Sequence, residues 1–141
     1  MDYLIPPKKE EHYGKKTLVL DLDETLVHSQ FKAIEKPDII LPIEIENQVY
    51  DVYVLKRPGL EDFLRKMAPL YEIVVFTASL SKYADPLLNI IDKYGYCSYR
   101  LFREHCTFNR GSFVKDLERL GRPLNEVIIV DNAPASYLFQ P

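Results

Sequence analysis

The sequence predicts an α/β fold in which a parallel β-sheet carries helices on both faces and receives an inserted antiparallel β-hairpin. Short unbroken apolar runs, typical of parallel strands that are buried on both sides, alternate along the chain with segments of helical periodicity. One further segment alternates between apolar and polar residues, as antiparallel strands do. Since strands that alternate with helices imply right-handed crossovers, we expect a single sheet with parallel strands.

The composition limits the class of protein. The 141 residues fall within the ~100–200 typical of one domain, and 47% hydrophobic with 28% charged residues argues against disorder. A net charge of −3 is too small to favour direct binding of nucleic acid. No apolar run reaches the ~18 residues of a membrane-spanning helix, and the first residues lack a signal-peptide core. We therefore expect a nuclear or cytoplasmic protein that does not bind membranes and keeps Cys97 and Cys106 reduced.

Three apolar runs, at residues 17–20, 73–76 and 127–130, predict the strands of the sheet. Residues 1–16 precede the first run and contain two prolines, a glycine and mixed charges without periodicity. This composition predicts a flexible leader, so that residues 17–141 form the folded domain.

Helices are predicted between these strands. Residues 58–67 place apolar side chains at i, i+3, i+4 and i+7, with prolines near both ends. A second apolar stripe over residues 87–94 opens near Asp85 and is closed by a glycine, and a short third helix over residues 115–120 is stopped by Gly121.

Residues 43–54 alternate about a polar turn near residues 46–48, which predicts a hairpin within an insertion of about residues 39–56. The register of the turn is open, because Asn47 tolerates a positive φ in more than one arrangement. Since the insertion separates the first strand from the helix at residue 58, we expect it to form a cap or rim.

Polar side chains follow each of the three apolar runs. Asp21 and Asp23 come after the first run, Thr77 after the second, and Asp131 and Asn132 after the third. Ligands of open α/β sheets bind at the carboxyl ends of the strands. We therefore expect these side chains to meet in one cleft.

Two aspartates at i and i+2 suit phosphoryl transfer. An ionised Asp21 can attack phosphorus as a nucleophile, and a like charge nearby raises the pKa of a second carboxyl, so Asp23 can act as general acid and later as base. These anionic groups require a divalent cation to accept a phosphate. Mg²⁺ prefers oxygen ligands, which Asp21, Asn132 and the backbone carbonyl of Asp23 can supply.

The phosphoryl oxygens also need donors, and Thr77 and Lys115 are the candidates. Lys115 lies at the start of the predicted third helix, where the helix N-terminus would add to the attraction for an anion. Structural alternatives exist for each group. The aspartates can cap a turn, Thr77 can cap a helix, and Lys115 can be a solvated helix residue.

Five segments closely resemble the small C-terminal-domain phosphatases of the haloacid dehalogenase superfamily, and the resemblance extends over about residues 16–141. They are DLDETLVHS at 21–29, VLKRP at 54–58, FTASL at 76–80, KYAD at 82–85 and DNAPASY at 131–137. The resemblance implies Mg²⁺-dependent dephosphorylation of phosphoserine through an aspartyl-phosphate. The implied substrates are the heptad repeats of RNA polymerase II or other nuclear phosphoproteins.

The same resemblance implies roles for individual residues. Asp21 would be the nucleophile, Asp23 the general acid and base, and Thr77 and Lys115 the phosphate-binding residues. The metal would be held by Asp21, Asp23 and Asn132, with Asp131 in support. An apolar pocket that accepts a proline near the phosphoserine, together with an arginine within reach of phosphate, would by position consist of Phe31, Ile43, Ile45, Leu80, Tyr83 and Arg103.

The family continues past residue 141 with a further strand and a helical tail, so the resemblance predicts a domain that is truncated at its C-terminus. The strand at 127–130 would then be an apolar edge, which favours pairing with a second copy of the chain. Two departures from the family pattern, Ala133 and Gln140, are not expected to touch the reaction.

Two other functions are compatible with parts of the pattern. A phosphopeptide-binding or scaffolding module would keep the cleft without turnover. A receiver-like phospho-acceptor also uses Asp, Thr and Lys at strand ends, but its acceptor Asp follows a later strand, whereas Asp21 and Asp23 follow the first strand here.

Overall fold

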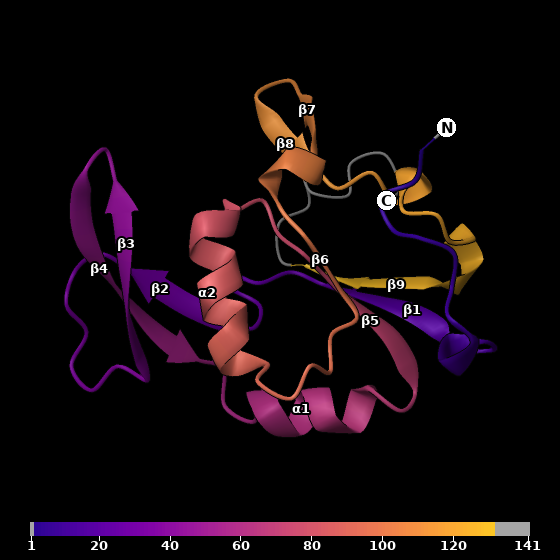
Figure 1. The fold of residues 1–141 in the computed structure, drawn as a ribbon, viewed down its shortest axis with the longest axis horizontal. Coiled ribbons are helices and arrows are strands. Elements are labelled where there is room, and N and C mark those ends of the chain that lie inside the picture. Colours follow the sequence, from indigo (N-terminus) through magenta and orange to yellow (C-terminus); the bar gives the residue numbers. More distant parts are fainter. Residues whose placement is uncertain (1, 132–141) are drawn as a thin grey trace.

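A computed structural model describes residues 2–131 of the chain. Its centre is a four-stranded sheet in which all neighbouring strands are parallel, in the order β6-β5-β1-β9 (Figure 1). These strands are β1 (Lys16–Leu20), β5 (Tyr71–Phe76), β6 (Tyr99–Leu101) and β9 (Val127–Val130). The predicted parallel sheet is confirmed, with β6 as an additional short strand.

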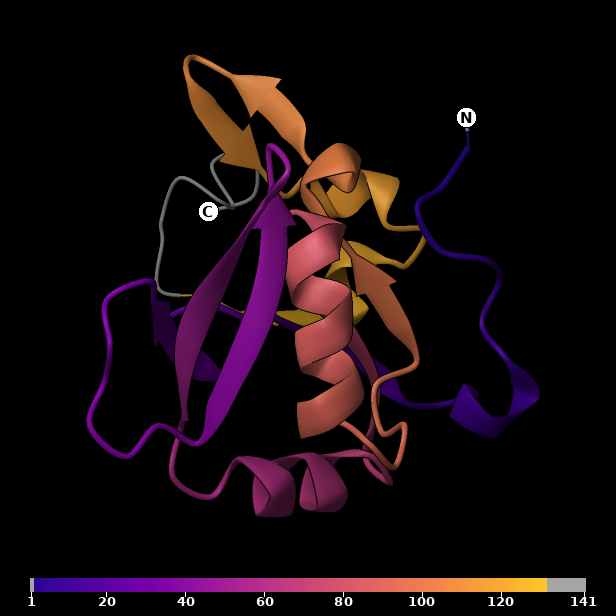
Figure 2. The same ribbon diagram turned by 60° about the vertical axis from the view of Figure 1, so that its left-hand side comes forward.

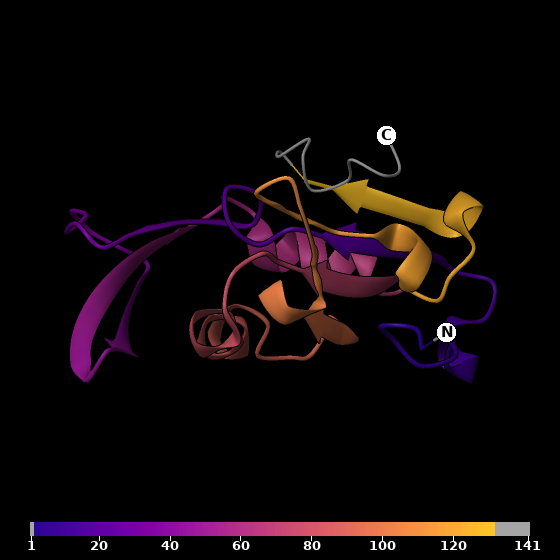
Figure 3. The same cartoon turned by 90° about the horizontal axis from the view of Figure 1, so that it is seen from above.

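The two α-helices, α1 (Leu60–Met67) and α2 (Ser81–Ile91), contribute to one hydrophobic core. That core includes Leu18, Leu20, Ile73 and Val75, which alternate along β1 and β5 and so lie on one face of the sheet. The opposite face carries Val19, Val74 and Phe76, which pack with Leu120 beside the 3₁₀-helix η3 (Leu117–Arg119) and with Ile5. Helical segments thus cover both faces, but the second face has a 3₁₀-helix where the sequence predicts an α-helix. Figure 3 shows the strands of the sheet from above, with β9 at one edge.

The N-terminal segment differs from the prediction of a flexible leader. Ile5 is buried in the second core, and the backbone N–H groups of Leu4 and Ile5 donate to the carbonyls of Arg119 and Leu120 at 2.8 and 3.3 Å. A 3₁₀-helix, η1 (Glu10–His12), then leads into β1 and buries His12. Leu4 and Ile5 thus join this segment to the second core.

Two helix boundaries also differ from the sequence prediction. The segment predicted as a helix from Lys115 to Leu120 contains only η3, because the Asp116 side chain accepts the Glu118 N–H at 3.2 Å and begins a single 3₁₀ turn. The helix α2 ends at Ile91 rather than near residue 94. The buried carboxylate of Asp92 accepts the backbone N–H groups that follow, from Tyr96 and Cys97, at 2.8 and 3.0 Å.

The inserted hairpin is confirmed as part of a three-stranded antiparallel sheet of order β2-β4-β3. Its strands are β2 (Val27–Gln30), β3 (Ile39–Ile45) and β4 (Gln48–Lys56). The pairing of Ile45 with Gln48 leaves a two-residue turn in which Glu46 and Asn47 have φ of 50° and 65°, as a type I′ turn requires. This turn resolves the register, and Figure 2 shows the hairpin beside α2, which β3 contacts.

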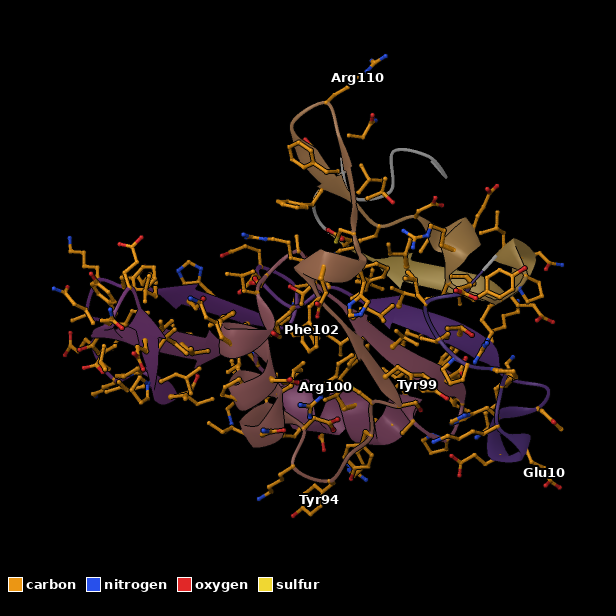
Figure 4. The ribbon with its side chains drawn as sticks, turned by 45° about the horizontal axis from the view of Figure 1, so that its top comes forward. Glu10, Tyr94, Tyr99, Arg100, Phe102 and Arg110 are labelled. Atoms are coloured by element: carbon orange, nitrogen blue, oxygen red, sulfur yellow. The ribbon has the colours of Figure 1, made fainter. Side chains whose placement is uncertain are left out.

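A second hairpin, absent from the sequence prediction, connects β6 to η3. It consists of β7 (Thr107–Asn109) and β8 (Ser112–Val114), and its turn places Arg110 and Gly111 at φ of 49° and 81°. Figures 1 and 2 show it projecting from the body of the domain, and Figure 4 shows Arg110 at its tip. Within residues 2–131, no helix has the length and apolar character needed to cross a bilayer.

Candidate active site

The register of the central sheet brings the predicted polar groups to one edge. Leu20 pairs with Val75 in β5 and with Val130 in β9, so the carboxyl ends of these three strands are level. Asp21 follows β1 directly and its backbone N–H donates to the Val130 carbonyl at 3.0 Å. Thr77 follows β5 and Asp131 follows β9. Asn132 lies outside the described residues.

Lys115 joins two of these strand ends through its side chain. Its Nζ lies 2.9 Å from Asp21 Oδ1 and also donates to Asp131 Oδ2. Lys115 is only 1% exposed and the Asp131 side chain is fully buried. Lys115 is positioned by β8, the strand that it follows, and not by a helix N-terminus as the sequence predicts. Two carboxyl groups therefore share one buried ammonium group.

The protonation of Asp21 depends on opposing influences. Burial raises the pKa of its carboxyl above the usual value, the Lys115 ammonium acts against this rise, and the negative charge of Asp131 adds to it. The second oxygen of Asp21 has only a long contact, 3.5 Å, with the Thr25 hydroxyl. Asp21 is thus a nearly buried carboxylate that is held from one side by a cation.

Thr77 is buried at the end of β5, and its Oγ1 accepts the backbone N–H of Ser79 at 3.0 Å. This contact closes a tight turn at the same strand end as Asp21. Thr77 does not cap α2, whose N-cap residue is Leu80. Cys106 lies beside it, with its Sγ 3.9 Å from the Thr77 carbonyl oxygen. Burial raises the pKa of the Cys106 thiol to about 11, so this cysteine is not a thiolate near neutral pH.

Asp23 is oriented differently from Asp21, toward a group of hydroxyls. Ser79 Oγ donates to Asp23 Oδ2 at 2.5 Å, and the Tyr83 hydroxyl donates to Asp23 Oδ1 at 2.8 Å. Ser29 Oγ lies 3.4 Å from the same Oδ1 and 2.8 Å from the Tyr83 hydroxyl. Burial, followed by the charge of Asp23, raises the pKa of the Tyr83 hydroxyl far above its usual value, so this hydroxyl stays protonated.

Sequence reasoning missed Ser29 and Ser79 as partners of Asp23. Both lie inside the segments that carry the family resemblance, at residues 21–29 and 76–80. That location is the one sequence signal that could have identified them.

Asp23 also lines a cleft of about 410 Å³ between the inserted hairpin and the start of α2. Each of the six residues that the sequence assigns to a substrate pocket lines this same cleft: Phe31, Ile43, Ile45, Leu80, Tyr83 and Arg103. Phe31 and Leu80 are 61% and 44% exposed, so apolar surface is available to a ligand. Arg103 is held at the rim, since its Nε donates to the Ala78 carbonyl at 2.7 Å and its guanidinium lies 4.9 Å from the centre of the Phe113 ring.

The described part of the site suits a hard cation by the chemistry of its donors. Asp21 offers carboxylate oxygens and Asp23 a backbone carbonyl, which are the ligand types that Mg²⁺ binds. Among residues 2–131, no group of three or more His, Cys, Asp or Glu side chains is arranged to hold a metal by itself.

The sequence is similar to a known protein family and to several of its members. Residues 16–141 match the model of the family described as NLI interacting factor-like phosphatase. The chain is 58% identical over 139 residues to the human CTD small phosphatase-like protein, covering 99% of this chain and 50% of that protein. It is 59% identical over 138 residues to the probable C-terminal domain small phosphatase of Dictyostelium discoideum, covering 98% of this chain and 45% of the relative. The chain thus spans about half the length of these curated relatives.

A solved structure supports the fold independently. The fission yeast RNA polymerase II CTD phosphatase Fcp1, bound to beryllium fluoride, superposes with a TM-score of 0.72 at 22% identity. The match covers 89% of this chain and 39% of that one. The shared architecture confirms the mixed α/β fold with a parallel sheet and antiparallel additions.

Proposed function

The chain belongs to the NLI interacting factor-like phosphatase family, and from this premise we propose that it carries the catalytic centre of a protein phosphatase that hydrolyses phosphoserine through an aspartyl-phosphate. One observation supports this proposal most strongly. Asp21, at the end of the central strand β1, is a nearly buried carboxylate paired with Lys115, while Asp23 faces the adjacent cleft. Carboxylates in two such different environments suit a nucleophile and a general acid.

In the proposed first step, an Asp21 oxygen attacks phosphorus and the bond between phosphorus and the serine Oγ breaks. Asp23 donates a proton to the departing Oγ. The departing Oγ belongs to a serine of the peptide. A general acid that lines the peptide cleft therefore lies on the side of the leaving group.

In the second step, Asp23 is ionised and takes a proton from water. The water oxygen attacks the phosphorus of the aspartyl-phosphate, Asp21 departs as a carboxylate, and inorganic phosphate is released. The buried positive charge of Lys115 attracts the phosphoryl oxygens in both steps. Thr77 and the backbone N–H groups of its turn are the proposed neutral donors, and Asp131 holds Lys115 in place.

We propose Mg²⁺ as the cofactor, held by Asp21, by the backbone carbonyl of Asp23 and by Asn132. When bound, it would offset the negative charge that two carboxylates present to a phosphate. The available donors support this assignment, because the Asp21 carboxyl and the Asp23 carbonyl offer oxygen atoms, which Mg²⁺ prefers.

The proposed substrate is a phosphoserine peptide in an extended, proline-rich conformation. The cleft supports this class, since aromatic and aliphatic side chains line it beside Asp23 and Arg103 stands at its rim. Residues 100–122 contain six Lys or Arg against three Asp or Glu, and this bias would attract an anionic peptide. Several relatives are named for the C-terminal domain of RNA polymerase II, which makes its heptad repeats the first peptide to test.

The test is a phosphate-release assay with a phosphorylated heptad peptide and Mg²⁺. We expect turnover by the unmodified chain, loss of turnover in Asp21→Asn, and no change in Asp62→Asn, which removes an exposed carboxylate on α1. If the unmodified chain binds the phosphopeptide but releases no phosphate, the scaffolding alternative replaces the enzymatic one. Turnover that persists in Asp21→Asn would exclude Asp21 as the nucleophile.

A further inference from the structure

We propose that Tyr83, Ser29 and Ser79 are positioning residues that set the direction of the Asp23 carboxyl group. This inference rests on the function proposed above and adds three hydroxyls to the site. None of the three is required by the chemistry of the reaction itself. Each is placed at Asp23 by a different element: Ser29 by β2, Ser79 by the turn after β5, and Tyr83 by α2.

The contacts engage both oxygens of the carboxyl group. Ser79 Oγ binds Oδ2 at 2.5 Å, and the Tyr83 hydroxyl binds Oδ1 at 2.8 Å. A carboxyl group with one donor can rotate about its last bond, whereas donors on both oxygens define its plane. Asp23 is therefore oriented by hydrogen bonds from outside its own loop.

The number of protons on each hydroxyl limits which hydrogen bonds the cluster can form. A tyrosine hydroxyl has one proton and can donate only one hydrogen bond, which Asp23 Oδ1 accepts at 2.8 Å. Ser29 Oγ lies 2.8 Å from the Tyr83 hydroxyl and 3.4 Å from the same Asp23 oxygen. The Ser29 and Tyr83 hydroxyls therefore hold each other beside Asp23.

The elements that carry these hydroxyls are packed against buried residues. Ala84, next to Tyr83 in α2, is fully buried, and Ser29 pairs with the fully buried Val54 of β4. Ser79 is held by its backbone N–H, which donates to the buried Thr77 Oγ1 at 3.0 Å. Thr77 therefore also supports Asp23 indirectly, through the turn that carries Ser79.

Tyr83 also lines the cleft beside Asp23. Its ring and its hydroxyl should therefore have separable effects: the ring contributes to peptide binding, and the hydroxyl to proton transfer by Asp23. Tyr83→Phe removes only the hydroxyl. The expected result is a lower kcat with little change in KM, for a phosphopeptide and for a small aryl phosphate alike.

The experiment compares Tyr83→Phe with Tyr94→Phe, which removes the hydroxyl of an exposed tyrosine after α2. General acid–base catalysis contributes about 10²–10⁴-fold to rates, and we expect the loss of one of several orienting bonds to cost roughly three- to tenfold in kcat. Ser79→Ala should act similarly, and Ser79→Thr, which retains a hydroxyl, should recover part of the loss. Tyr94→Phe should match the unmodified chain.

Crystal structures of the unmodified chain and Tyr83→Phe supply a readout that does not depend on activity. We expect the Asp23 carboxyl group to turn in the variant. An active unmodified chain whose kcat is unaffected by Tyr83→Phe would overturn the inference. If the unmodified chain has no turnover, the function proposed above fails, and the crystal structures alone decide the inference: an Asp23 side chain that stays in place disproves it.

Discussion

Lys115 Nζ and Asp21 Oδ1 lie 2.9 Å apart in the interior, although 94 residues separate them in the sequence. Asp131 binds the same ammonium group, so the ends of β1 and β9 and the strand β8 meet at one cation. Removal of a charge from a buried pair leaves its partners without compensation, which is more costly than the pair is stabilising. The site and the stability of the fold are thereby linked.

Lys115→Met tests this link. It removes the buried ammonium group that Asp21 and Asp131 share, and we expect a loss of about 3–5 kcal/mol in the free energy of unfolding. Urea denaturation measures it, with Lys66→Met on the exposed side of α1 as the control. The double variant Lys115→Met/Asp131→Asn should recover part of the loss. An additive double variant would show that the two side chains are not coupled.

A second buried pair predicts a pH dependence of stability. Glu72 is fully buried and binds Arg122 through two contacts of 2.8 Å, with Thr17 donating a third bond. Burial by itself raises the pKa of Glu72, but the bonds from Arg122 and Thr17 outweigh it, and the folded-state pKa lies below the usual 4.5. A lowered pKa contributes stability that is complete above the unfolded-state value and is lost as the pH falls through the folded-state value.

We therefore expect the free energy of unfolding of the unmodified chain to decrease as the pH falls below 4.5 and through the folded-state pKa of Glu72. The decrease should be smaller in Glu72→Gln, which has no carboxyl group to titrate. Urea titrations from pH 7 downward provide the comparison. Equal acid slopes for the two proteins would contradict the assignment of this dependence to Glu72.

The inserted hairpin offers a test of local backbone strain. Glu46 has a φ of 50°, a conformation that costs most residues about 1 kcal/mol and that asparagine tolerates better. Glu46→Asn should stabilise the protein by about 0.5–1 kcal/mol. Thermal denaturation provides the measurement, and Glu44→Asn, in the extended strand β3, is the matched control. A lower melting temperature for Glu46→Asn than for the unmodified chain would disprove the strain argument.

The cleft predicts a selective effect on peptide substrates. Leu80 is 44% exposed in the free protein, and a bound proline would cover it. Leu80→Ala should weaken peptide binding by about 1 kcal/mol, or roughly fivefold in KM. The ratio of KM for a phosphopeptide to KM for an aryl phosphate should rise relative to the control Leu70→Ala, an exposed leucine before β5. An unchanged ratio would argue that the peptide binds elsewhere.

Much of the fold follows from local patterns in the sequence. The unbroken apolar runs that became β1, β5 and β9 predict a sheet buried on both faces, and the alternation around Asn47 predicts the inserted hairpin. β6 and β7 have three residues each, too few for a periodic signal. The N-terminal segment differs from the prediction because only Leu4 and Ile5 join it to the core, and two residues give no periodic signal.

Some features of the site also follow from local sequence, whereas others depend on contacts between distant segments. The position of Asp21 at a strand end is a local property, and so is readable from the sequence. The contacts of Asp23 depend on the hydroxyls of Ser29 and Tyr83, which are brought together by β2 and α2, and no spacing along the chain reveals which oxygen faces which donor. The same reason applies to Lys115. The sequence predicts it at the start of a helix, whereas in the structure it follows β8 and its Nζ contacts Asp21.

The central claim is that Asp21 becomes phosphorylated during turnover. Rapid acid quench of the chain with a phosphopeptide and Mg²⁺, followed by mass spectrometry of proteolytic fragments, measures this directly. The account predicts one phosphate on the fragment that contains Asp21 and none on that fragment in Asp21→Asn. Turnover with no phosphorylated fragment at any quench time, or with the phosphate on another residue, would contradict it.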